Sequence, residues 1–214
     1  MALSKVDYNS LNVTAAASKA LKWNSGADGF ETGDVAGAMV LLDTFTSDGS
    51  DDTATFASSI DSTYKEYIFK FYDIHPESDS KNFQVNFRDG GSAYDATKTS
   101  TYFRANHNEA NTATSLAYDG ALHLAQGTGV QGLTENSGND NDQCSSGYLH
   151  LYDPSSTTFV KHYIARVNTT IGGDYSIDNY VAGYCNVTAA IDGVQFSFSA
   201  DEIQAGTIKM YGVA

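Results

Sequence analysis

The sequence predicts an all-β protein built from antiparallel strands, as a sandwich or a barrel. Strand-like blocks rich in aromatic and β-branched residues recur from Ala38 almost to the C-terminus. Within these blocks apolar and polar residues alternate with a period of two, as in a half-buried strand. Helix-like segments are too few for the alternating strands and helices of an α/β protein. Together these observations favour a protein that works through its surface, by binding or assembly.

The first 35 residues differ from the remainder of the chain. Residues 15–22 are mainly Ala, Leu and Lys and predict a short helix; Trp23 follows, and residues 24–29 predict a turn. Because such a helix is marginal alone in water, it has to pack either across its own domain or against a neighbouring subunit or larger particle. We therefore divide the chain into an N-terminal arm or attachment segment, residues 1–35, and a β-sandwich domain, residues 36–214.

Five strands are expected in the first half of the domain, at residues 38–45, 53–57, 64–72, 82–88 and 99–105. In the third strand, even steps separate Tyr64, Ile68 and Tyr72, and in the fourth one face carries Phe83, Val85 and Phe87. The connections are an acidic turn at 48–52, a loop at 73–80 and a turn at 89–91 of the kind found in hairpins.

Residues 106–145 are the least regular part of the sequence. We expect a helical turn at 113–121 and a polar loop at 138–143, and we expect this region to face outward. Five strands follow, at residues 147–152, 157–168, 179–187, 193–199 and 206–213, with turns at 153–156 and 171–174. The pattern therefore predicts about ten strands in all.

Charge and hydropathy exclude several classes of function. Acidic residues outnumber basic ones by 26 to 12, a formal net charge of −14, and such a surface repels nucleic acid and anionic lipid. No stretch approaches the roughly 18 apolar residues of a membrane helix. The first ten residues lack the apolar core of a secretory signal, which predicts a protein kept in the cytosol or exported without such a signal. We thus expect no nucleic-acid or membrane partner.

Residues that carry chemistry are sparse. Cys144 and Cys185, the only cysteines, are expected to be free thiols. Oxygen-bearing side chains at Asn139, Asp140 and Asp142 resemble a calcium loop, but the Gly and distal Glu of such a loop are missing, so a solvated turn is favoured and calcium stays the weaker alternative. His150 and His162 are expected to be half-buried rings bonded to a neighbour. No catalytic motif is present, and we predict no enzyme, cofactor or resident metal.

The 14 tyrosines are a softer signal of recognition. A sugar- or protein-binding face is one interpretation, and packing in the core is the other, for Tyr102, Tyr118, Tyr148 and Tyr175.

Four runs resemble a family of short structural proteins encoded by marine tailed bacteriophages: residues 19–33, 138–143, 153–162 and 206–213. This resemblance implies a jelly-roll-like β-sandwich displayed in several copies on a virion, and the strand pattern gives that sandwich about eight to ten strands. It carries no catalytic motif.

The resulting functional prediction is a non-enzymatic virion structural protein on the outside of the particle, either a capsid decoration or a tail-associated fibre. It would be assembled in the host cytoplasm and bind itself, as a homotrimer, and other virion proteins. Attachment is assigned to apolar residues of the arm: Leu3, Val6, Tyr8, Leu11, Leu21 and Trp23. The alternative is a carbohydrate-binding adhesin that recognises a host surface glycan, and a depolymerase is the third hypothesis.

Overall fold

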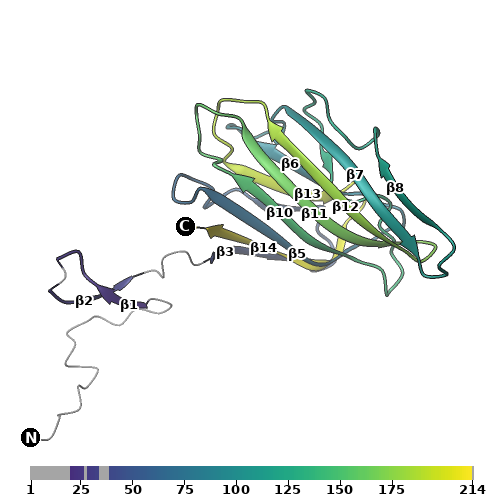
Figure 1. The fold of residues 1–214 in the computed structure, drawn as a ribbon, viewed down its shortest axis with the longest axis horizontal. Coiled ribbons are helices and arrows are strands. Elements are labelled where there is room, and N and C mark those ends of the chain that lie inside the picture. The colour runs from purple at the N-terminus through teal and green to yellow at the C-terminus, as the bar shows by residue number, and fades with distance from the viewer. Residues whose placement is uncertain (1–19, 27, 34–38, 214) are drawn as a thin grey trace, which may run out of the picture. The chain divides into compact units, whose positions relative to one another are not determined.

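The computed structural model describes residues 20–26, 28–33 and 39–213 (Figure 1). The chain divides into two compact units, a small one at the N-terminus and a large one at Met39–Val213. The described residues contain fourteen strands and no helix.

The N-terminal unit contains a hairpin of β1 (Ala20–Trp23) and β2 (Phe30–Gly33). Trp23 lies directly opposite Phe30, and their rings stack with centroids 4.4 Å apart. The predicted turn is confirmed, since the amide of Asn24 donates to the carbonyl of Gly29. The predicted helix is wrong over residues 20–22, where strand pairing and the aromatic stack outweigh weak helix propensity; residues 15–19 lie outside the described residues.

Two antiparallel sheets form the large unit. The eight-stranded sheet has the order β3-β14-β5-β10-β11-β12-β7-β8. Its strands are β3 (Met39–Thr46), β5 (Glu66–Pro76), β7 (Lys98–Asn108), β8 (Thr114–Tyr118), β10 (Ser145–Tyr152), β11 (Lys161–Ile171), β12 (Tyr175–Cys185) and β14 (Ile203–Val213). The four-stranded sheet has the order β4-β13-β6-β9, with β4 (Thr53–Phe56), β6 (Phe83–Arg88), β9 (Gln131–Gly132) and β13 (Gly193–Phe198).

The pairing of strands distant in sequence follows a nested scheme. The first strand of the unit, β3, pairs with the last, β14, and the second, β4, pairs with the last but one, β13. Inside these pairs, β5 pairs with β10 and β6 with β9. This is jelly-roll connectivity, to which β11, β12, β7 and β8 add four strands beyond β10. The prediction of an antiparallel jelly-roll-like sandwich is confirmed, although the two sheets contain twelve strands instead of about eight to ten. The open edges at β3 and β8 exclude a closed barrel.

An aromatic cluster holds the two sheets together. The ring of Phe196 on β13 lies 5.3 Å from Phe69 and 5.2 Å from Phe71, both on β5, and contacts Phe56 and Phe83 of its own sheet. All five rings are buried. Edge-to-face contacts of this kind add to the stability that burial of their area provides.

The buried faces of the strands follow the expected alternation. Phe83, Val85 and Phe87 are buried together, as predicted. On β5 the odd-numbered residues from Tyr67 to Phe71 point inward, so Ile68 and Tyr72 lie on the opposite, solvent-facing side of the sheet.

Segments 73–80 and 89–91 depart from the expectations. Strand β5 continues through Pro76 because Ile74 is buried and Pro76 lies opposite Ile203. Residues 89–91 do turn the chain, with positive φ at Gly90 and Gly91. However, they connect β6 in one sheet to β7 in the other and form no hairpin.

The irregular region 106–145 also differs from the prediction. Residues 114–118 form strand β8, because the edge of β7 offers backbone partners. Much of the segment faces inward: Leu133 is buried, and the side-chain amide of buried Gln131 bonds to Ser100 of β7 and Tyr163 of β11. The expectation that this region faces outward is therefore wrong for its second half.

The turns at 153–156 and 171–174 are confirmed. The amide of Ser156 donates to the carbonyl of Asp153, and Asp174 donates to the carbonyl of Ile171 between the paired strands β11 and β12.

Two buried lysines flank a buried cysteine on the inner face. Lys161, Cys185 and Lys98 are direct neighbours across β11, β12 and β7. The ammonium of Lys98 donates to Asn86 Oδ1 at 2.5 Å and to the carbonyl of Ala96 at 2.7 Å, whereas Lys161 donates to the carbonyls of Val187 and Ala189. Both lysines thus tie loops to the sheet. Cys185 and Cys144 are free thiols, as predicted.

Burial lowers the pKa of Lys98 from 10.5 to about 8, because it disfavours the charged form. Between these two values the unfolded chain binds a proton that the folded protein has lost, so stability rises with pH. We expect the unfolding free energy of the wild type to rise between pH 8 and pH 10 relative to that of Lys98→Met, by up to about 1.4 kcal/mol per pH unit. Urea titrations followed by far-UV circular dichroism measure this, and parallel pH profiles of the two proteins would contradict it.

Candidate functional site

The candidate site is the face of the eight-stranded sheet that points away from the four-stranded sheet, called the outer face below. It carries most of the exposed large apolar side chains in the described residues: Met39, Leu41, Tyr72, Phe103, Leu116, Tyr118, Tyr148 and Ile164. Solvated sheet faces are usually polar. An apolar, aromatic face of this extent is typical of a contact surface.

One row of residues crosses seven strands of the outer face in register. From β14 to β8 the successive opposite residues are Lys209, Lys70, Tyr148, Arg166, Tyr180, Phe103 and Tyr118. We call this the cation–aromatic row. Side chains opposite one another on neighbouring strands are close enough to interact, so the row forms a continuous band.

The middle of the row is a fixed network. The guanidinium of Arg166 donates to both carboxylate oxygens of Asp178, with Nη2 2.6 Å from Oδ2, and lies 4.8 Å from the ring centroid of Tyr180. The Tyr180 hydroxyl also donates to Asp178, at 2.9 Å, and its ring stacks on Phe103 at 4.6 Å. The hydrogen bond from Arg166 lowers the pKa of Asp178, and that from Tyr180 contributes further. The bond to Asp178 raises the pKa of Tyr180.

At the β14 end, the row places two lysines directly opposite each other. Lys209 Nζ lies 5.6 Å from the ring centroid of Tyr72, and Lys70 Nζ lies 5.7 Å from that of Tyr211. Each ammonium therefore makes a cation–π contact with a tyrosine of the other strand. Burial, and then the neighbouring Tyr72, raise the pKa of Tyr211.

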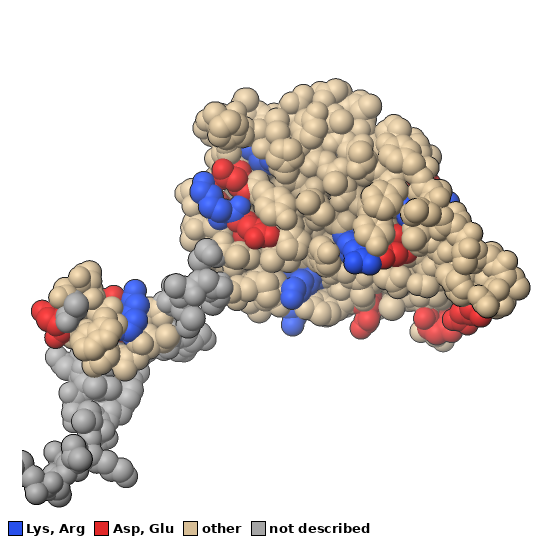
Figure 2. Space-filling view, viewed as in Figure 1, with Lys and Arg blue, Asp and Glu red and all other residues tan. Residues whose placement is uncertain are grey.

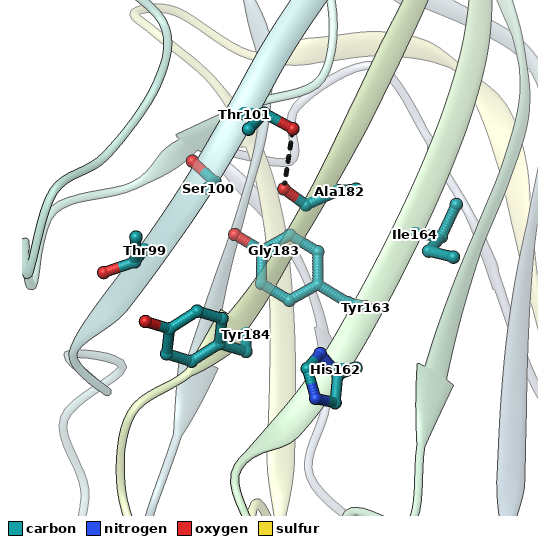
Figure 3. A pocket seen from close by; sticks show the side chains of 9 residues that line it. All are labelled: Thr99, Ser100, Thr101, His162, Tyr163, Ile164, Ala182, Gly183 and Tyr184. Atoms are coloured by element: carbon teal, nitrogen blue, oxygen red, sulfur yellow. Dashed lines mark hydrogen bonds between the residues drawn. The ribbon is translucent and has the colours of Figure 1, made fainter.

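A shallow hollow of about 410 Å³ lies beside the row on β7, β11 and β12 (Figure 3). Its floor is low because Ala182 and Thr101 are small, and the Thr101 hydroxyl donates to the carbonyl of Ala182 at 3.3 Å. Larger side chains surround this floor: Tyr184, His162 and Ile164.

Two further hollows share Gly147 and Tyr148. Lys70, Tyr72 and His150 line one of them, whereas Arg166, Asn168 and Asp178 line the other. Tyr148 thus stands between two hollows that each contain a cationic side chain. The arrangement offers aromatic faces for stacking and polar groups for hydrogen bonds, as ligand-binding surfaces do.

Basic side chains are largely paired: six of the ten Lys and Arg residues in the described chain form ion pairs with carboxylates. In Figure 2 the visible side of the large unit has wide areas without charge; some blue and red side chains lie together, and further red side chains lie along its lower edge without a blue neighbour. His150 bonds to Glu66, so the prediction for this ring is confirmed, whereas His162 is exposed and packs beside Tyr184.

The weak calcium candidates lie in an exposed turn. The carbonyl of Asp140 accepts from the amide of Gln143, and Asn139 donates to the carbonyl of Glu77 at 3.0 Å, while Asp142 is exposed. Within the described residues, no three His, Cys, Asp or Glu side chains are placed to hold a metal ion.

The residues predicted to make contacts with sugars or partner proteins differ in their exposure. Tyr118 and Tyr148 share the outer face, Tyr102 is fully buried against Asn179, and Tyr175 is half-buried at the start of β12. Leu21 and Trp23 are exposed on the hairpin, and four assembly candidates lie outside the described residues: Leu3, Val6, Tyr8 and Leu11.

Sequence reasoning missed most of the cation–aromatic row. The alternation of Lys70 and Tyr72 along β5 signals a shared face, and so does that of Tyr148 and His150 along β10. The register that aligns Lys70 with Lys209 depends on long-range pairing and has no local sequence signal.

No protein-family model matches the chain, and no curated protein sequence matches it. Within the described part of the chain, no helix could span a membrane.

Because its pKa is lowered in the folded protein, Asp178 stabilises the fold above its unfolded pKa near 3.8, and this contribution is lost as the pH falls through the folded value. We expect the wild type to lose more stability than Asp178→Asn between pH 5 and pH 3. Urea unfolding at several pH values tests this, with Asp201→Asn, whose carboxylate pairs with Lys81, as a second ion-pair variant for comparison. An equal loss in wild type and Asp178→Asn would show that the hydrogen bonds to Asp178 do not stabilise its carboxylate in the folded protein.

Proposed function

We propose that the protein is a non-enzymatic structural protein of a bacteriophage virion, displayed on the outside of the particle and attached through its N-terminal unit. Its copies associate with one another, as the homotrimer of the functional prediction, and with other virion proteins. Jelly-roll domains serve widely in viral capsids and in lectins, which supports this class of protein.

The N-terminal hairpin is the observation that carries the proposal. Its strands have four residues each, and Leu21, Trp23 and Phe30 are 49%, 61% and 38% exposed. An isolated two-stranded hairpin is at best marginally stable in water. A hairpin that displays a Trp–Phe stack therefore gains most from a partner surface, and aromatic residues dominate the binding energy of such contacts.

A second candidate function, a carbohydrate-binding adhesin, is favoured by a different observation. The hollows of the outer face are lined by tyrosines with polar neighbours, an arrangement suited to stacking and hydrogen bonding with sugar rings. The two functions use different surfaces, the hairpin and the outer face, so one protein can perform both.

The test of the attachment role uses the variant Trp23→Ser/Phe30→Ser and virions purified from the phage that encodes the chain. We expect the wild type to co-sediment with virions, and the variant to bind at least about tenfold more weakly, because an aromatic hot spot contributes on the order of 2 kcal/mol. The matched control is Phe159→Ser, an exposed aromatic of the large unit, which should bind normally.

Sedimentation equilibrium of the same proteins measures self-association. Unchanged virion binding by the hairpin variant, or absence of the chain from purified virions by mass spectrometry, would overturn the proposed function.

A further inference from the structure

Lys70 and Lys209 are exceptional among the basic residues of the described chain, which has ten Lys and Arg residues. Six of them form ion pairs with carboxylates: Lys22, Lys65, Lys81, Arg88, Arg104 and Arg166. Lys98 and Lys161 are buried and bonded to carbonyl groups. Among the described residues, only Lys70 and Lys209 have neither kind of partner.

The placement of Lys70 directly opposite Lys209 destabilises the fold and is unexpected in such an acidic protein. Like charges directly opposite on neighbouring strands destabilise a sheet, and the chain has 26 acidic residues from which a partner could be drawn. Instead, Tyr72 and Tyr211 accompany the two ammonium groups and provide no neutralising charge. The site therefore concentrates positive charge that an external anion can neutralise.

The surroundings indicate what carries that anion. Lys70 and Tyr72 line a hollow of about 470 Å³ whose other side is the ring of Tyr148, the next member of the cation–aromatic row. Strands lie roughly 4.8 Å apart, so Tyr148 is one strand from Lys70 and two from Lys209. These spacings suit a small ligand that carries both an acidic group and a ring. The acidic group would lie over the two lysines, and the ring would lie over Tyr148.

We propose that this hollow, together with Lys209 directly opposite Lys70 on the neighbouring strand, is a binding site for an acidic saccharide. The ammonium groups of Lys70 and Lys209 bind its carboxylate or sulfate, and its sugar ring stacks on Tyr148. The site rests on the second candidate function, the carbohydrate-binding adhesin, and names the class of its ligand. It is independent of attachment, since it lies on the outer face and the attachment proposal rests on the hairpin.

The experiment measures binding of the purified full chain to oligosaccharides of dextran sulfate, polygalacturonate and unsubstituted dextran by isothermal titration calorimetry. We expect binding to at least one acidic saccharide, weakened by added salt, and none to dextran. The two acidic probes distinguish sulfate from carboxylate recognition. Failure to bind either acidic probe would overturn the proposal.

Variants locate the site. Lys70→Gln/Lys209→Gln should bind about tenfold more weakly, because it loses two charge-assisted contacts. The matched control Lys65→Gln/Lys81→Gln removes the same charge elsewhere and should bind within about twofold of the wild type. Tyr148→Ala should also bind more weakly, whereas Tyr118→Ala, at the far end of the row, should not.

If both double lysine variants lost the same amount of affinity for the acidic saccharide, net charge alone would explain the effect, and the proposed site would be refuted. Folding is monitored by far-UV circular dichroism and urea unfolding. The Lys70→Gln/Lys209→Gln variant is expected to be at least as stable as the wild type, because it relieves the repulsion between opposite lysines.

Discussion

The register of the strands, fixed by packing between the two sheets, is the constraint on which the rest of the structure depends. Phe196 of β13 contacts Phe69 and Phe71 of β5, so those residues must face inward. Because side chains alternate along a strand, Lys70 and Tyr72 must then face outward. A slip of one residue would exchange the two faces. The core therefore determines which residues the outer face displays.

The eight-stranded sheet is wider than the four-stranded sheet that covers it, and its added strands are covered differently. Over β7, β11 and β12, region 106–145 supplies buried polar side chains, including Gln131 of the edge strand β9 and Ser137 in the loop after it, whose hydrogen bonds reach Ser100, Tyr163 and Thr169. Hydrogen bonds between buried groups depend on exact geometry and are costly to leave unmade. These hydrogen bonds hold the added strands to this region, and they leave the other face of the strands free to carry the hollow at Ala182.

The sequence predicts the strands better than the site, for physical reasons. Alternation is local, so the buried face of 82–88 is visible in Phe83, Val85 and Phe87. The helix expected at 113–121 fails because β7 offers an edge to pair with, a fact absent from the local residues. Tyr102 and Tyr148 have similar sequence surroundings, yet Tyr102 is buried and Tyr148 is exposed. Only the sheet topology decides which of the two faces inward. The opposition of Lys70 and Lys209 depends on the same long-range pairing.

Attachment by the hairpin and recognition by the outer face form a proposed division of roles, which a density map of the intact virion tests most directly. This division predicts that Trp23 and Phe30 are buried against a neighbouring chain, while Lys70, Tyr148 and Lys209 face the surrounding solvent. A map in which the outer face is buried against the particle, with the hairpin free, would contradict it.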